Sequence, residues 1–144
     1  MTWSIEEILD ILPDGNLSLL FYRIFDSFMK EHSPEYISPS AFKYSKEDGK
    51  MSTNWNKYSD ANQIRLEGKH PSDRYGVVSL IVKEIRLNPE LSKLKIEHTP
   101  KAGNQAHTDI SGLPEYEAIS KEDYKHLQLL LSRLAEWEIN NYLK

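Results

Sequence analysis

The stretch Lys93–Leu113, KLKIEHTPKAGNQAHTDISGL, decides the fold class of this chain. Residues 94–99 and 106–111 alternate apolar with polar side chains, the pattern typical of half-buried β-strands. The loop between them contains the turn-forming residues Pro100 and Gly103. The stretch therefore predicts a β-hairpin.

The register of this hairpin decides which side chains share a face, because a slip of one residue moves every side chain to the other face. Pairing Thr99 with Ala106 would put His98 opposite His107, but it would also bury polar side chains against apolar ones. Pairing Thr99 with His107 keeps the apolar face continuous. We therefore expect the second register.

In the expected register, Glu97 lies across from Asp109 on the face that carries His107. Facing carboxylates repel one another unless a proton, a histidinium or a cation lies between them. We therefore take Glu97, His107 and Asp109 as candidate catalytic residues, with His107 as acid or base. A divalent metal on the same residues is a variant of this hypothesis. The alternative is that all three are ordinary surface or hydrogen-bonding side chains.

Four further residues are candidates for substrate binding. Arg74 and Arg86 are included because a guanidinium is suited to clamp phosphate or carboxylate, although each could equally be a surface ion-pair partner. His98 and Asn104 lie on the hairpin itself. In the expected register His98 could instead be a core or edge histidine that bonds a hydroxyl or carbonyl, and Asn104 could simply favour the turn.

The rest of the chain contributes the surrounding scaffold. Residues 17–30 carry apolar side chains at helical spacing, which favours a helix, although the aromatic and branched run 19–25 also suits a buried strand. The other predicted elements are a helix over 5–12, an irregular aromatic-rich region over 36–58 with a short strand at 50–55, a helix over 60–66, a strand over 77–87 and a helix from Ser120 to about Leu143.

This order predicts one α+β domain over residues 1–144. N-terminal helices occupy residues 1–31, an irregular and β region occupies 36–113, and a long C-terminal helix occupies 120–143. We expect a small antiparallel sheet, with the hairpin at about 94–111 in its centre, packed by the helices at both ends of the chain.

Composition excludes several classes of function. The chain has 144 residues, no cysteine and a net charge of −4. Disulfides, thiolate zinc sites and thiol nucleophiles are therefore excluded, and the composition fits a cytoplasmic protein. No apolar run is long enough to span a membrane, so we expect no membrane partner. The acidic balance disfavours nucleic acid. Lys93, Lys95 and Lys101 are the only hint of a local basic patch, and exposed lysines on a strand edge more often serve solubility. No cofactor motif is present, so no cofactor is expected.

Several short segments occur in an order that resembles a group of small bacterial proteins without an established activity. They are Ile37–Phe42, Met51–Trp55 with Tyr58, Gly76–Leu80, Ile85-Arg86, His98–Pro100 and Asn104–His107. The resemblance covers about residues 22–114. It implies a bacterial origin and draws attention to Arg86 and His107, but it implies no mechanism.

Two functions remain open at this point. The first is a binding or accessory module that contacts another protein, as one component of a bacterial multi-gene system such as a defence or toxin–antitoxin locus. The second is a small hydrolase or transferase acting on a phosphate-containing substrate, such as a nucleotide or RNA, with a His/Asp centre on the hairpin. We expect the module, because no nucleophile, dinucleotide or metal-binding motif stands out.

Overall fold

The computed structural model describes residues 3–25, 36–43, 49–112 and 121–140. Within them, a six-stranded antiparallel sheet runs in the order β4-β5-β2-β1-β3-β6. The strands are β1 (Leu19–Phe25), β2 (Met51–Trp55), β3 (Tyr75–Ile81), β4 (Lys95–His98), β5 (His107–Ser111) and β6 (Glu136–Ile139). The helices are α1 (Ala61–Leu66), α2 (Val82–Leu87) and α3 (Lys121–Leu134), with 3-10 turns η2 (Pro39–Ala41) and η3 (Ser72–Arg74). The predicted α+β class is confirmed, but the hairpin β4–β5 lies at one edge of the sheet and not in its centre as predicted, because β1 and β3 form the middle strands with β2.

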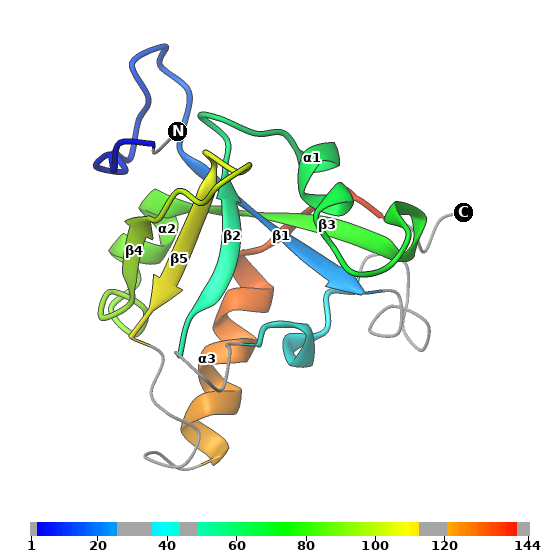
Figure 1. Cartoon of the computed structure of the whole chain (residues 1–144). Helices are drawn as coiled ribbons and strands as arrows, with labels where there is room; N and C mark the ends of the chain where they lie inside the picture. The colour runs from blue at the N-terminus through cyan, green and yellow to red at the C-terminus, as the bar shows by residue number, and fades with distance from the viewer. Residues whose placement is uncertain (1–2, 26–35, 44–48, 113–120, 141–144) are drawn as a thin grey trace.

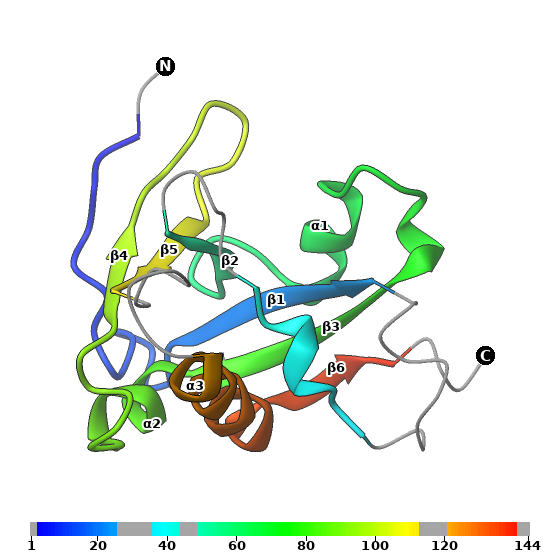
Figure 2. The same cartoon turned by 90° about the horizontal axis from the view of Figure 1, so that it is seen from below.

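Helices cover the two faces of the sheet unequally (Figures 1 and 2). The long helix α3 packs on one face and buries Leu131 against the main core, which includes Leu20, Met51 and Trp55. On the other face the short helix α1 buries Ile64 over β1 and β3. The part of that second face formed by β2, β5 and β4 lies beside α1 (Figure 1). No helix in the described part of the chain combines the length and apolar character needed to cross a membrane.

The segment 17–30 forms a strand where the sequence favoured a helix. Residues 19–25 are β1, which pairs with β2 on one side and β3 on the other. A central strand needs apolar side chains on both faces, and here Leu20 and Ile24 face α3 while Phe21 faces α1. Apolar residues on both faces imitate helical spacing, which is why the prediction was wrong. Residues 26–30 lie outside the described residues.

The predicted N-terminal helix over 5–12 is also absent from the structure. Ile8 and Leu12 are buried, but the backbone is irregular and Ile11 forms an isolated bridge with Leu17. So short a helix is marginal on its own, and tertiary contacts therefore decide its conformation. One such contact is the Glu6 backbone N–H, which donates to His98 Nδ1 at 3.0 Å.

Two predicted elements end earlier than expected. The apolar run 77–87 divides into β3 and α2, and the Val82 N–H at the junction donates to the Ser18 carbonyl at 3.1 Å. The C-terminal helix ends at Leu134, after which β6 pairs with β3. The helix over 60–66 is confirmed as α1, with Asp60 as its N-cap, and the strand over 50–55 is confirmed as β2.

Candidate functional site

The hairpin adopts the register that keeps its apolar face continuous. Ile96 pairs with Ile110, which confirms the predicted register. Glu97 consequently lies across from Asp109. Because side chains alternate along a strand, both lie with His107 on the face opposite α3.

His107 is held as a neutral imidazole. Its Nδ1–H donates to the Thr99 carbonyl at 3.0 Å, and the Thr99 hydroxyl donates to Asp109 Oδ2 at 3.0 Å. The other ring nitrogen, Nε2, is buried without a hydrogen-bond partner and lies 3.8 Å from Asp109 Oδ1. Burial lowers the pKa of His107, and the charge of Lys101 lowers it further, while Asp109 acts in the opposite direction.

This lowered pKa predicts a loss of stability in acid. The unfolded chain takes up a proton near pH ~6.5 that the folded chain resists, so the stabilisation is complete above that pH and is lost as the pH falls below it. Urea unfolding at pH 7.5 and 5.5 measures the difference. In His107→Asn, whose amide can still donate to the Thr99 carbonyl, the difference should shrink. The exposed His126→Asn serves as the control, and an equal reduction there would contradict the assignment.

The structure gives no support to a metal bound by Glu97, His107 and Asp109. In the described part of the chain, no three His, Cys, Asp or Glu side chains come together in a way that could hold a metal ion. Glu97 is exposed and accepts only a long hydrogen bond of 3.5 Å from the Ser111 hydroxyl. The candidate centre is therefore the pair His107 and Asp109.

His98 has both ring nitrogens engaged within the chain. Nδ1 accepts the Glu6 backbone N–H at 3.0 Å, so the proton is on Nε2, which donates to the Gln105 carbonyl at 2.7 Å. The ring is 2% exposed and packs edge-on against Trp55. His98 is thus placed to join the N-terminal segment to the hairpin, and it offers no ring nitrogen to a ligand in this conformation.

The other predicted substrate-binding residues lie in different places. Arg86, on α2, forms an ion pair with Asp10 at 2.8 Å and is remote from the cavities described below. Arg74, in η3, lies over the ring of Phe25, 4.8 Å from its centroid. Of these candidates, Asn104 alone lines the same cavity as His107.

The sheet opens between β1 and β2 (Figure 1). Pairing of these strands ends at Phe21 and Asn54. A backbone hydrogen bond also joins the two strands two residues before Phe21. In an antiparallel pair of strands every second pair of facing residues is hydrogen-bonded, so Arg23 and Ser52 would form the next hydrogen-bonded pair. The strands have diverged before that point. The backbone polar groups of Arg23 and Ser52 are therefore directed into the opening.

Two cavities meet at this opening and share Arg23 and Ser52. We call the two together the groove. The larger cavity measures about 630 Å³, and its other charged or aromatic lining residues are Tyr22, Phe25, Lys43, Lys50, Lys69, His70 and Tyr75. The smaller cavity measures about 390 Å³, and its other polar lining residues are Thr53, Asn54, Glu67, Lys101, Asn104 and His107.

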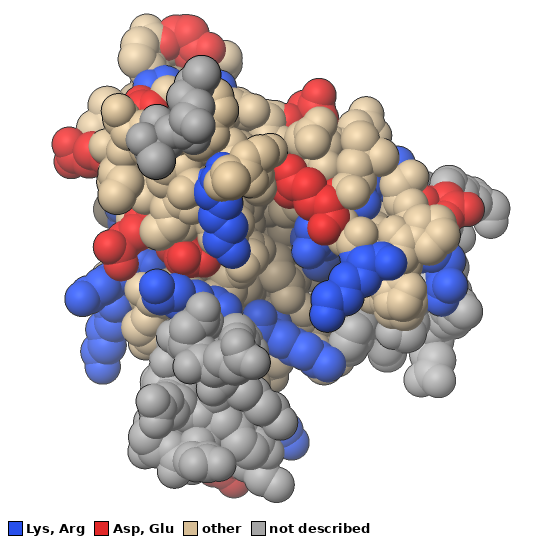
Figure 3. All heavy atoms as spheres, in the orientation of Figure 1, with Lys and Arg blue, Asp and Glu red and all other residues tan. Residues whose placement is uncertain are grey.

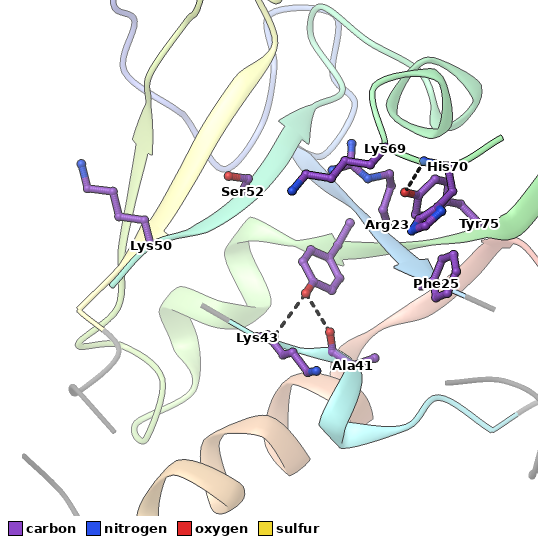
Figure 4. A pocket seen from close by; sticks show the side chains of 10 residues that line it. Arg23, Phe25, Ala41, Lys43, Lys50, Ser52, Lys69, His70 and Tyr75 are labelled. Atoms are coloured by element: carbon purple, nitrogen blue, oxygen red, sulfur yellow. Dashed lines mark hydrogen bonds between the residues drawn. The ribbon is translucent and has the colours of Figure 1, made fainter. Parts of the chain in front are cut away.

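The groove concentrates positive charge in an acidic protein. Among the described residues that line it, five are lysine or arginine and only one, Glu67, is acidic. Figure 3 shows blue side chains around a hollow on this face, and Figure 4 shows Lys69 beside Arg23 at the larger cavity, whereas Lys50 extends away from it. Arg23, at the junction, donates to the Ile64 carbonyl at 3.0 Å and lies 5.5 Å from the centre of the Tyr75 ring. Its guanidinium is therefore held in place beside both cavities.

A cluster of amides and a carboxylate forms the polar wall of the smaller cavity. Asn104 Nδ2 donates to Asn54 Oδ1 at 3.0 Å and to Glu67 Oε2 at 3.2 Å. Asn54 Nδ2 donates to the same Glu67 oxygen at 3.0 Å. These contacts tie the hairpin loop, β2 and the end of α1 together, so the hydrogen-bonding groups of this wall are held in a defined arrangement.

Comparison of the chain with protein-family models, curated proteins and solved structures finds no match. The site therefore has to be interpreted from its own chemistry. Sequence reasoning located His107, Asp109 and Asn104 because they lie on one hairpin. It missed Arg23, Ser52 and Lys69, which come from distant segments and meet only where the strand ladder ends.

Proposed function

We propose that this chain is a small binding module that holds an anionic, phosphate-bearing ligand in the groove. The observation that carries the proposal is that, among the described residues lining the two cavities, five are basic and one is acidic, in a chain whose net charge is −4. Such local segregation of charge attracts anions even when the whole molecule is acidic.

The junction of the two cavities supplies the groups that a phosphate needs. The Arg23 guanidinium offers planar donors, and Ser52 lines the same two cavities beside it. Lys69 and Lys101 add charge from the two sides. A phosphate at the junction would therefore be bound by charge-assisted hydrogen bonds in a partly enclosed setting.

Binding fits the geometry better than catalysis does. A general acid or base must come within hydrogen-bond reach of the proton that it transfers. The free nitrogen of His107 is sealed from solvent and faces Asp109. It therefore contributes to the wall of the smaller cavity but presents no reactive atom to a ligand there.

The first test is isothermal titration calorimetry of the protein with inorganic pyrophosphate and with uridine 5′-monophosphate. Arg23→Gln should weaken binding about 10-fold or more, because it removes a charge-assisted hydrogen bond. Lys69→Gln, at an exposed position, should weaken it roughly 3-fold to 10-fold. Lys83→Gln is the matched control, since Lys83 is an exposed lysine on α2 outside both cavities. If neither ligand binds, or the three variants lose affinity equally, the proposal is wrong.

One observation favours a second function, hydrolysis or transfer at a phosphate ester. His107 lines a ligand-sized cavity, and its buried, unpartnered Nε2 lies 3.8 Å from Asp109 Oδ1, an acid–base pair next to that cavity. Turnover of a phosphodiester by the wild type, abolished in His107→Asn, would favour this function over simple binding. The bacterial multi-gene setting stays a prediction.

A further inference from the structure

We propose that the ligand of the groove is a short single strand of nucleic acid, with successive nucleotides in the two cavities and the phosphate between them at Arg23 and Ser52. This inference rests on the proposed function and adds the class of ligand. It follows from the distribution of charge, from the size of the cavities and from the different chemistry of their walls.

The cations are spread along the groove. Lys101 lines only the smaller cavity, Lys69 lines only the larger one, and Arg23 lines both. A single phosphate at the junction would leave the outer lysines without a role in binding. A chain of phosphates, one for each of the three positions, matches the arrangement.

Each cavity is large enough for one nucleoside. Small-molecule sites commonly measure about 300–1,000 Å³. The two volumes here, about 630 and 390 Å³, both fall in that range. Because Arg23 and Ser52 line both cavities, the two lie side by side, at a spacing that suits successive nucleotides of one strand.

The wall of the smaller cavity is suited to the edge of a base. Asn54 and Asn104 bond to one another and to Glu67, and the exposed Glu67 carboxylate keeps acceptor sites beyond those bonds. Bases present amino groups as donors, so they match such an acceptor. A ligand with anionic groups alone, such as a polyphosphate or a polyglutamate peptide, would bring its charge against Glu67. The carboxylate therefore favours a nucleotide over those ligands.

The far end of the larger cavity is aromatic (Figure 4). The rings of Phe25 and His70 lie 4.5 Å apart between centroids, and Tyr75 packs edge-on against Phe25. His70 is the exposed member of this group. Bases of single strands stack on aromatic side chains without strong sequence preference. The groove thus combines an aromatic platform, a row of cations and a base-edge wall.

The test is fluorescence anisotropy with a labelled RNA hexamer and a labelled DNA hexamer of random sequence. The dissociation constants of the hexamers should be at least about 10-fold lower than the inhibition constant of uridine 5′-monophosphate as a competitor. With three phosphate contacts, affinity should fall about 20-fold between 50 and 200 mM salt. Lys101→Gln and His70→Ala should each weaken hexamer binding, whereas Lys83→Gln should not. Melting curves of each variant establish that it is folded. A difference between RNA and DNA would identify which strand the groove prefers.

The outcomes separate this inference from the proposed function. If pyrophosphate and the mononucleotide bind as tightly as the hexamers, and Arg23→Gln weakens all of them, the phosphate site stands and the single-strand inference fails. If a hexaglutamate peptide displaces the hexamers at equal concentration, the ligand class is peptide and the inference is overturned. If no phosphate-bearing probe binds, the proposed function and the inference fail together.

Discussion

Trp55→Ala should lower the free energy of unfolding by about 3–5 kcal/mol, the usual cost of removing a large aromatic side chain from a core. Trp55 is 1% exposed in the middle of the sheet, and its indole N–H donates to the Ser18 hydroxyl at 3.2 Å. The substitution would leave a cavity beside Tyr58 and deprive a buried hydroxyl of its partner. Small domains are stable by only about 5–15 kcal/mol, so the variant should be close to unfolding.

Urea unfolding followed by far-ultraviolet circular dichroism measures this effect. Trp3→Ala is the matched control, because Trp3 is 37% exposed. Exposed positions of this kind usually change stability by no more than about 0.5 kcal/mol. Equal losses in the two variants would mean that Trp55 is not part of the core.

His98→Ala should cost about 2–4 kcal/mol of stability, from the cavity and from two buried backbone groups left without partners. Those groups are the Glu6 N–H and the Gln105 carbonyl. The N-terminal segment should also become easier to cleave with protease, because one of its attachments to the hairpin is lost. Glu6 keeps a second attachment through its carboxylate, which contacts Lys57 and Tyr58.

Ligand binding by the His98→Ala variant shows whether His98 has a structural role or the predicted role in substrate binding. Where enough of the variant remains folded, its affinity for pyrophosphate should equal that of the wild type. Glu97→Gln, an exposed change on the same strand, controls for effects of charge. A large loss of affinity with unchanged stability would show instead that His98 contacts the ligand.

Local patterns predicted the local parts of this structure. The hairpin register follows from the need to keep Ile96 and Ile110 on one apolar face, and the position of α1 was predicted from its local sequence, although Asp60 caps it where Ser59 was expected. Both depend on residues close together in the chain. The pair His107 and Asp109 could be located in the same way.

The wrong predictions concern contacts between distant segments. The strand β1 lies between two others, so both of its faces are buried and its pattern loses the period of two. The strand β6 forms by pairing with the edge of β3, and no local sequence pattern near Trp137 predicts that pairing. The groove is a stronger case, since it depends on where β1 and β2 separate. No local sequence pattern indicates where the pairing of two strands ends.

The separation of β1 from β2 also limits how far the stability of this protein can be raised while the groove is kept. If Arg23 and Ser52 were brought into register, the sheet would gain backbone hydrogen bonds and the domain would become harder to unfold. The same change would close the junction of the two cavities. Selection for heat resistance alone would therefore favour variants in which the proposed ligand site is closed, and stability and the proposed binding would then be in conflict in the central strands of the sheet.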